Sequence, residues 1–300
     1  MTSTTAPPLA EALVARPAKR RREGNRLLPA SGWWIICTCL AILFASPLLI
    51  SLLSSFKTTA AASATNPTLL PSEFSLENYQ SLQGVGVGIG NYVMNSVLVT
   101  LGTVVGTVIL STMAGFGFEK YGFFGRNTAF MVIVAMLMIP FQAVVTPLYI
   151  ILNQLGFQNS LVGVTLVYIT YQLPFALFVM RNSFAGVPQA LEEAALVDGA
   201  SSFRMFRQIM LPLVRPGVIT VALFAFFAAW NEFFAALILL SDQSQYTLPV
   251  ALTLLQGSLL GQISWGTLQA GVMVSMVPCV IIYAVLQRYY VAGLLSGGIK

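Results

Sequence analysis

Glu232 is the residue of this sequence with the clearest potential for chemistry inside a membrane. It is the only acidic residue within an apolar block, here Gly217–Leu240, and it directly follows Trp230 and Asn231. In a helix it would lie about 22 Å from the start of that block, at 1.5 Å per residue. An ionisable group at that depth must face protein or water. Glu232 therefore either lines a solute path or an external gate, or bonds to another helix or a partner protein.

Neutral polar side chains in other apolar blocks could complete such a path. They are Gln142, Tyr168, Tyr171 and Gln172. Amide and hydroxyl groups suit an uncharged, hydroxylated solute, although they also hold neighbouring helices together in membrane proteins. A cationic solute would favour several acids within the membrane, and a phosphate several bases. Since the blocks offer one acid and no clearly internal base, a neutral solute is preferred to a polyamine or a phosphate.

Catalytic and metal chemistry are disfavoured by what the sequence lacks. It has no histidine, and its three cysteines, Cys37, Cys39 and Cys279, lie within apolar runs, so neither a usual zinc site nor a disulfide framework is expected. No Ser–Lys or paired-Asp arrangement within the blocks suggests an intramembrane enzyme. The P-loop pattern GxxxxGK followed by Ser or Thr is absent, so the chain cannot hold nucleotide phosphates in that way. We expect a protein without catalytic activity and without a cofactor of its own.

The elements that position these residues are predicted to be membrane-spanning helices. Hydrophobic residues make up 57% of the 300 residues and charged residues 8%, against roughly 25% charged in soluble domains. Six blocks reach the length of about 20 apolar residues that a spanning helix needs: Trp33–Ser55, Tyr92–Phe118, Asn127–Ile150, Leu161–Met180, Gly217–Leu240 and Thr267–Gln287. We therefore predict an all-α membrane protein whose six spans occupy residues 33–290. Prolines in or beside these blocks invite kinks; they are Pro47, Pro140, Pro147, Pro174 and Pro278.

The basic residues indicate which side of the membrane each loop faces. If the N-terminus is cytoplasmic, Lys57 is the only one of the 15 Lys and Arg residues on the outer side, in agreement with the positive-inside rule. Both termini, the loop 181–216 and the tail 291–300 are then cytoplasmic, and the loop 56–91 is external. The basic segment 1–32 is expected to be disordered and to lie against anionic membrane lipid, which explains the net charge of +5 without nucleic acid.

The long cytoplasmic loop is predicted to form two short helices that meet at a glycine corner. Pro188 suits a first helical turn, and Gly199 is placed to end that helix in the left-handed conformation. Ser201 or Ser202 can cap a second helical stretch, which stops at Pro212.

The first of these helices has the character of a docking element. Ala194 and Ala195 leave one side thin enough for a protein groove to approach the backbone, and apolar contacts are offered by Leu191, Leu196 and Val197. The alternative is an amphipathic helix that lies on lipid headgroups. Docking is favoured, because an anionic leaflet would repel the three acids of this helix. These acids are Glu192, Glu193 and Asp198.

The same loop resembles a known family. Glu193-Ala194-Ala195, then Gly199 after three residues, Ile209 after nine more and Leu211-Pro212 after one more are similar to the EAA loop of permease subunits of binding-protein-dependent ABC importers. Asp198-Gly199-Ala200 resembles the variant of the carbohydrate branch, the maltose and glycerol-phosphate type, and within it the G-type subunits of maltose permeases. Further similar segments are Leu76–Tyr79, Leu173–Phe175, Trp230–Phe233 and the ending Gln287–Lys300, which lacks the closing GAVKG usual in the family.

This resemblance implies a non-catalytic permease subunit of an ATP-driven sugar importer in the bacterial inner membrane. The loop would seat a coupling helix in a groove of a cytoplasmic ATPase dimer, which binds ATP and Mg²⁺. A second, homologous permease would complete the path, and an external solute-binding protein would deliver the sugar, on whose face Trp230 could stack. The residues implied in coupling are Glu192, Glu193, Ala194, Ala195, Asp198, Gly199, Ala200, Ile209, Leu211 and Pro212, while Gly297, Gly298, Ile299 and Lys300 would reach toward the ATPase.

Two alternatives stay open. The same machinery could import a solute other than a sugar. A proton-coupled secondary transporter could instead use Glu232 as its proton carrier and need no ATPase, but it would leave the docking loop unexplained.

Overall fold

The computed structural model describes residues 30–64, 68–257, 259 and 264–298. The predicted basic segment 1–32 therefore lies almost wholly outside the described residues, as do Ile299 and Lys300. Every regular element in the described part is a helix, which agrees with the predicted all-α class. The chain divides into two compact units, residues 1–48 and 49–300, which are treated separately below.

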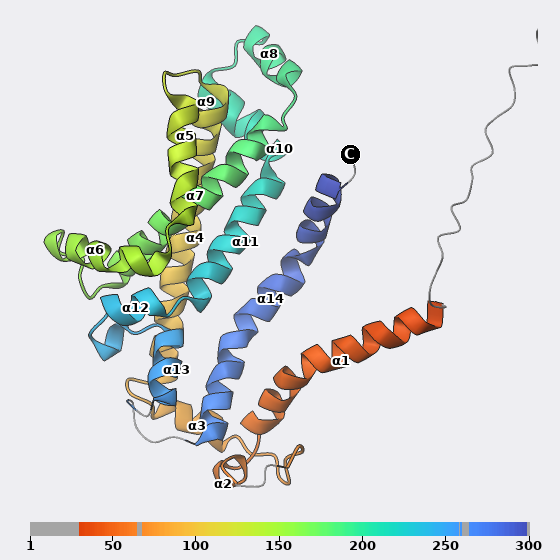
Figure 1. The fold of residues 1–300 in the computed structure, drawn as a ribbon, viewed down its shortest axis with the longest axis vertical. Helices are drawn as coiled ribbons and strands as arrows, with labels where there is room; N and C mark the ends of the chain where they lie inside the picture. Colours follow the sequence, from red (N-terminus) through yellow and green to blue (C-terminus); the bar gives the residue numbers. More distant parts are fainter. Residues whose placement is uncertain (1–29, 65–67, 258, 260–263, 299–300) are drawn as a thin grey trace, which may run out of the picture. The chain divides into compact units, whose positions relative to one another are not determined.

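The helices are shown in Figure 1. Helix α1 (Ala30–Ser55) begins in the first unit and ends in the second. The second unit continues with α2 (Thr59–Ala62), α3 (Glu77–Gln83), α4 (Ile89–Lys120), α5 (Arg126–Ala135), α6 (Phe141–Gln154), α7 (Leu161–Ala185), α8 (Gln189–Val197), α9 (Ser202–Met205), α10 (Leu211–Leu213), α11 (Arg215–Asn231), α12 (Phe234–Leu239), α13 (Leu248–Gln256) and α14 (Trp265–Gly298). Short 3-10 turns lie at Met136–Met138 and Gln243–Gln245, and a π-helical turn at Phe206–Met210.

Four helical segments of the described residues are long and apolar enough to cross a membrane: Gly32–Ser55, Ile89–Lys120, Leu161–Ala185 and Trp265–Leu286. They correspond to the first, second, fourth and sixth predicted spans. Two further candidates are bent pairs, namely Arg126–Met138 with Phe141–Gln154, at 106°, and Ser202–Leu213 with Arg215–Asn231, at 75°. Neither the third nor the fifth predicted block is one continuous helix. By length and apolar character, the described residues offer four candidate spans, or up to six if each bent pair crosses once.

Pro140 explains the break in the third block. A proline disfavours the helical conformation in the residue before it, and Ile139 is extended, with φ −83° and ψ 120°. Pro140 then stands at the N-cap of α6, which runs across the direction of α5 in Figure 1. The kink expected at this proline is confirmed, whereas the others lie inside helices: Pro47 in α1, Pro147 in α6, Pro174 in α7 and Pro278 in α14.

Helices α4 and α7 pack closely because α4 has glycines where the two helices meet. A Cβ atom at Gly102 would lie 2.9 Å from Cγ2 of Thr165, and one at Gly106 would lie 2.4 Å from Cδ1 of Ile169. Glycines four residues apart share a helix face and let two helices approach closely in a membrane. Helix α11 packs against both α4 and α7. These helices form a three-helix body, α4–α7–α11, which carries the loop with α8 at one end (Figure 1).

Hydrogen bonds of the Asn78 side chain join α3 to the end of α1 and to the start of α14. Its buried side-chain amide donates to the carbonyl oxygens of Ser55, at 3.1 Å, and Lys57, at 2.7 Å. Its side-chain oxygen accepts from the hydroxyls of Ser264 and Thr267, at 3.2 and 3.4 Å. Buried polar groups need such partners, so the family-like segment around Asn78 has a structural role in this chain.

Candidate functional site

The predicted coupling helix is α8, and its C-terminal end has the geometry expected for it. Gly199 has φ +73°, in the left-handed region. The N–H of Ala200 donates to the carbonyl of Ala195 at 2.9 Å, and that of Gly199 to the carbonyl of Leu196 at 3.0 Å. This pair of bonds is the Schellman motif, which satisfies carbonyl groups at a helix end. The prediction that Gly199 ends the helix in the left-handed conformation is confirmed.

The second helical stretch of the loop begins as predicted but ends elsewhere. The hydroxyl of Ser201 accepts from the N–H of Arg204 at 3.3 Å and caps α9. The predicted stop at Pro212 is wrong, since helix continues to Leu213 and the bend of 75° follows it. Proline lacks an N–H and its ring crowds the preceding turn. The π-helical turn just before it widens the helix and accommodates the ring.

One face of α8 packs into the chain's own core. Ala195 is 4% exposed and lies in an apolar cluster with Phe184 of α7, Met205 of α9 and Met210. This corrects the expectation that both alanines face a partner groove, because only Ala194 is exposed. Three other residues of the family-like pattern pack against the same cluster: Ala200, Ile209 and Leu211. The small side chain at position 195 lets α8 approach the three-helix body, and the pattern is therefore partly a packing pattern.

The exposed residues of α8 and of the glycine corner, with Phe203 of α9, form a surface that we call the docking surface. Its apolar members include Leu196, 62% exposed, Val197, 88% exposed, and Phe203 of α9, 69% exposed. Exposed apolar clusters of this kind mark sites of contact with protein or with membrane. The full docking surface comprises Leu191, Glu193, Ala194, Leu196, Val197, Asp198 and Phe203.

The two glutamates of α8 have different partners. Glu192 in the first turn of α8 forms an ion pair with Lys120, the last residue of α4. Glu193 is exposed and accepts from the side-chain amide of Gln189 at 3.0 Å. Of the two glutamates, Glu192 is thus engaged within the chain, and Glu193 is presented outward. Sequence analysis missed Lys120, although a base at the end of a predicted span, next to the predicted cytoplasmic side, was a usable indication.

Glu232 marks the break in the fifth predicted block. Helix α11 ends at Asn231, and Glu232 is extended, with φ −73° and ψ 128°. Its carboxylate accepts from the backbone N–H of Ala235 at 3.0 Å and of Ala236 at 3.4 Å, at the start of α12. It also accepts from the hydroxyl of Tyr168 on α7. Glu232 thus bonds to another helix of this chain, and its role at a solute path stays a prediction.

The side chains of Trp230 and Asn231 lie in different surroundings. Trp230 is 2% exposed, stacks against Phe226 with ring centroids 5.9 Å apart, and donates its indole N–H to the carbonyl of Ser275 on α14 at 3.0 Å. Its ring is therefore covered by protein in this conformation and is not available to stack on a sugar. Asn231 is exposed, and its side-chain amide donates to the carbonyl of Phe227 at 2.8 Å.

The other predicted path residues lie on α6 and α7 in different surroundings. Tyr168 is buried and bonded to Glu232, and Gln172, one turn further along α7, is half-buried. Tyr171 is exposed and packs on Phe141 of α6, with ring centroids 4.4 Å apart. Gln142 follows Phe141 and is exposed. The structure thus joins Tyr168 to Glu232 and Tyr171 to Phe141.

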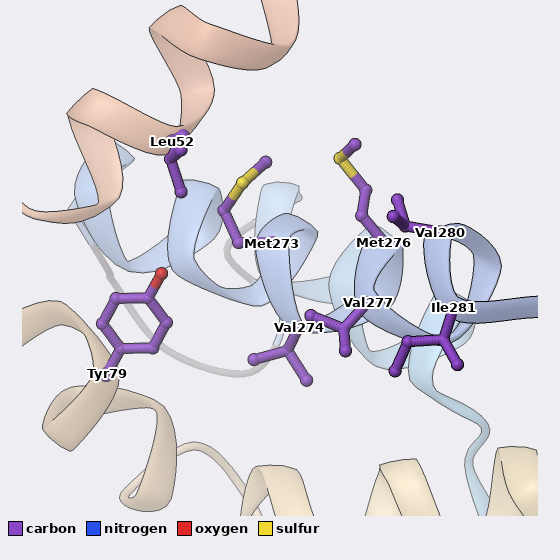
Figure 2. A pocket seen from close by; sticks show the side chains of 8 residues that line it. All are labelled: Leu52, Tyr79, Met273, Val274, Met276, Val277, Val280 and Ile281. Atoms are coloured by element: carbon purple, nitrogen blue, oxygen red, sulfur yellow. The ribbon is translucent and has the colours of Figure 1, made fainter. Parts of the chain in front are cut away.

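Figure 2 shows an apolar groove between α14 on one side and Leu52 of α1 and Tyr79 of α3 on the other. Its volume of ≈ 360 Å³ would suffice for a small ligand. Its lining is hydrocarbon and thioether apart from the Tyr79 hydroxyl, which already bonds to the hydroxyl of Ser55 at 2.9 Å. The groove therefore lacks the convergent polar groups that a hydroxylated solute needs. It is lined by Leu52, Tyr79, Met273, Val274, Met276, Val277, Val280 and Ile281.

Comparison with known proteins places these features in a family. Residues 107–295 match the family described as binding-protein-dependent transport system inner membrane component. The diacetylchitobiose uptake system permease protein NgcG of Streptomyces coelicolor is 34% identical, over 84% of this chain and 82% of its own length. The trehalose/maltose transport system permease protein MalG of Thermococcus litoralis is 32% identical, over 79% of this chain and 87% of its own length.

A solved structure shares the fold. It is that of a bacterial ABC transporter involved in the import of the acidic polysaccharide alginate, and one of its chains superposes with a TM-score of 0.75 at 22% identity. The superposition covers 87% of this chain and 95% of that one. The matched family segment contains α8, the docking surface and the break at Glu232. This chain is a multi-pass membrane protein that belongs to the family of binding-protein-dependent transport system inner membrane components.

Proposed function

We propose that this chain is one of two homologous permease subunits of an ATP-driven sugar importer and forms half of the translocation path. The sugar, a mono- or oligosaccharide, is delivered by an external solute-binding protein. Two relatives at 34% and 32% identity are named for the uptake of diacetylchitobiose and of trehalose and maltose, which supports a sugar as the solute. The neutral polar side chains of the predicted path, Gln142, Tyr171 and Gln172, suit such a solute.

The docking surface is the observation that carries the ATP-driven part of this proposal. Its apolar side chains are exposed at the end of a helix whose other face is fixed to the three-helix body. A cytoplasmic ATPase dimer, which holds ATP and Mg²⁺, binds this surface and moves α8 when it closes. The coupling residues are Glu193, Ala194 and Asp198 by contact, and Glu192, Ala195, Gly199, Ala200, Ile209, Leu211 and Pro212 by holding the loop in shape.

The proposed topology follows from the distribution of basic residues. Both termini and the loop 181–216 are cytoplasmic, and the loop 56–91 is external, in a bacterial inner membrane. Residues 1–32 form a basic cytoplasmic segment, and the spans lie within residues 33–290. Helix α14 continues to Gly298, so the proposed tail from 291 onward is helical over most of its length. Its last residues, Gly297 to Lys300, extend toward the ATPase.

Transport proceeds by alternating access in this proposal. Movement of α8 passes to α4, α7 and α11 through the apolar cluster that they share with the loop. The break at Glu232 and Asn231, together with Gln142, Tyr171 and Gln172, then faces the path as the helices rotate. Tyr168 and Trp230 are buried, and they hold that region in shape without contacting the solute.

A proton-coupled transporter that uses Glu232 is the second candidate. This candidate is suggested by Glu232, because it is the only acid within the predicted spans. However, the carboxylate accepts hydrogen bonds from two backbone N–H groups and from Tyr168. These hydrogen bonds give the residue a structural task within this chain, which argues against a proton carrier.

The test places a charge on the docking surface and leaves the fold unchanged. Val197→Asp is suitable, because a side chain that is 88% exposed contributes little to packing. Leu69→Asp, at an equally apolar position in the external loop that is 73% exposed, is the matched control. We expect Val197→Asp to lose copurification of an ATPase subunit and ATP-dependent uptake of diacetylchitobiose or maltose, while Leu69→Asp keeps the ATPase. Normal ATPase copurification with Val197→Asp would refute the docking assignment.

A further inference from the structure

Lys120 and Glu192 connect two elements that are far apart in sequence. Lys120 closes α4, and Glu192 lies in the first turn of α8. Their side chains form an ion pair and are 11% and 19% exposed. Each charge also suits its helix end, since a base is stabilised at a C-terminus and an acid at an N-terminus. The pair is therefore partly shielded from solvent and held by two helix ends.

The residue before Lys120 makes a second connection. Glu119 accepts from Nε of Arg181 on α7 at 3.2 Å, and the Arg181 guanidinium lies 4.0 Å from the ring centroid of Phe130 on α5. Beneath these charges, Phe116 of α4 packs against Phe184, with ring centroids 5.5 Å apart. Consecutive residues at the end of α4 thus bind α7 and α8, above a shared aromatic core.

Without the Lys120 pair, α8 contacts the three-helix body through side chains without directional bonds. Ala195 of α8 contributes a single methyl group to the apolar cluster. Apolar contact is non-directional, so it resists separation of α8 from the body better than it resists sliding. An ion pair between a lysine and a glutamate at two helix ends adds a contact whose energy depends on their relative position.

We propose that Lys120 is a positioning residue for energy coupling: its ion pair with Glu192 makes α4 move together with α8 throughout the transport cycle. This inference rests on the proposed function, in which α8 receives the movement of an ATPase. Motion then reaches α4 through a directional contact of its own, in addition to the apolar cluster that α8 shares with α4, α7 and α11.

The first test separates coupling from assembly. Lys120→Met keeps the aliphatic stem and removes the charge, Lys120→Arg keeps the charge, and Arg215→Met removes an exposed base at the start of α11 as the control. The readouts are ATPase copurification, ATP hydrolysis and solute uptake in proteoliposomes. We expect Lys120→Met to retain the ATPase but to lower uptake per ATP by about fivefold or more, the lower end of typical coupling between sites. Lys120→Arg and Arg215→Met should stay near wild type.

The double variant Lys120→Met/Glu192→Gln distinguishes a coupling role from simple charge compensation. If the pair transmits movement, the double variant is as poorly coupled as Lys120→Met alone, because the contact is absent in both. If the loss in the single variant comes only from an unpaired, shielded glutamate, the double variant recovers. Recovery of uptake per ATP would overturn the proposal, as would normal coupling in Lys120→Met.

A cross-link tests whether the two positions must stay together. Lys120→Cys/Glu192→Cys is made in a chain whose Cys37, Cys39 and Cys279 are replaced by Ala, and the new thiols are bridged with a bifunctional thiol reagent. We expect bridging to raise uptake per ATP toward the wild-type value. Uptake that stays low or stops after bridging would overturn the proposal. Absence of ATP-dependent uptake in the wild type would instead reject the proposed function itself.

Discussion

The phenolic hydroxyl of Tyr168 donates a hydrogen bond to the carboxylate of Glu232. Tyr168 belongs to α7, and Glu232 lies between α11 and α12, where its carboxylate also accepts from the N–H groups of Ala235 and Ala236. One acidic side chain thus joins three helices. A carboxylate near a helix N-terminus is stabilised by the helix dipole, so Glu232 has a structural reason to occupy an apolar segment.

Tyr168→Phe should destabilise the protein by about 1–3 kcal/mol, the cost of leaving a partly buried acceptor without one of its donors. The ring and its packing stay, so the loss reports on the hydroxyl alone. Thermal unfolding in detergent would measure it. Tyr171→Phe on the same helix is the control. Because Tyr171 is exposed, this variant should lose little stability. Equal unfolding temperatures for Tyr168→Phe and wild type would show that the bond contributes nothing.

The long helices and the shape of the coupling loop could be predicted from the sequence, because both depend on local features. Apolar length located Ile89–Lys120 and Leu161–Ala185. The left-handed end of α8 at Gly199 followed from glycine's tolerance of positive φ. Pro140 indicated a kink, although its size, 106° between the flanking segments, was not predictable because packing decides where α6 lies.

The break at Glu232 could not be predicted, because no proline or glycine marks it. The segment Trp230–Phe233 contains ordinary helix residues, and the chain leaves the helix where the carboxylate can cap α12 and meet Tyr168. The sequence also did not reveal the burial of Ala195 or the ion pair of Lys120 with Glu192. Each depends on a partner more than 60 residues away or on the packing of three helices, which periodicity and spacing do not encode.

Gly199→Pro should abolish uptake and ATPase copurification together while membrane insertion stays intact. Proline fixes φ near −65° and removes the N–H that bonds to Leu196, so the corner cannot close. Gly199→Ala should give a milder loss, about 1–2 kcal/mol, since a side chain there meets no neighbour and is strained only by the backbone. Membrane content by immunoblot, copurification and uptake are measured in parallel. Full activity of Gly199→Pro would remove the coupling role of the corner.

Glu193→Lys should leave the fold unchanged and prevent ATPase binding. The side chain is exposed and bonds to Gln189 within α8, so the reversal should change stability by less than about 0.5 kcal/mol. It places a positive charge in the middle of the docking surface. Glu73→Lys, at an exposed position in the external segment, is the matched charge reversal. Retained ATPase binding by Glu193→Lys would contradict the assignment of this face.

The predicted topology can be checked by cysteine labelling of sealed cells. Asp198→Cys and Glu77→Cys are made in a chain whose native cysteines are replaced by Ala, and both positions are exposed in the structure. A membrane-impermeant thiol reagent should label position 77 from outside and reach position 198 only after the cells are opened. Strong labelling at 198 with none at 77 would invert the orientation derived from the basic residues.

Glu232→Gln decides between a coupled ATPase and a proton carrier. Glutamine keeps the shape of glutamate and one oxygen acceptor, so it can still accept from Tyr168 or from an N–H of α12, with a loss of stability of about 1–2 kcal/mol from the weaker bonds. A neutral solute moved by an ATPase does not need the charge, and ATP-dependent uptake should persist with the proton gradient collapsed. A carrier would lose accumulation, because glutamine cannot exchange a proton. Uptake is measured in proteoliposomes with ATP and gradient varied separately. If wild-type uptake survives without ATP, disappears with the gradient and is absent in Glu232→Gln, the ATP-driven function is wrong and Glu232 carries the proton.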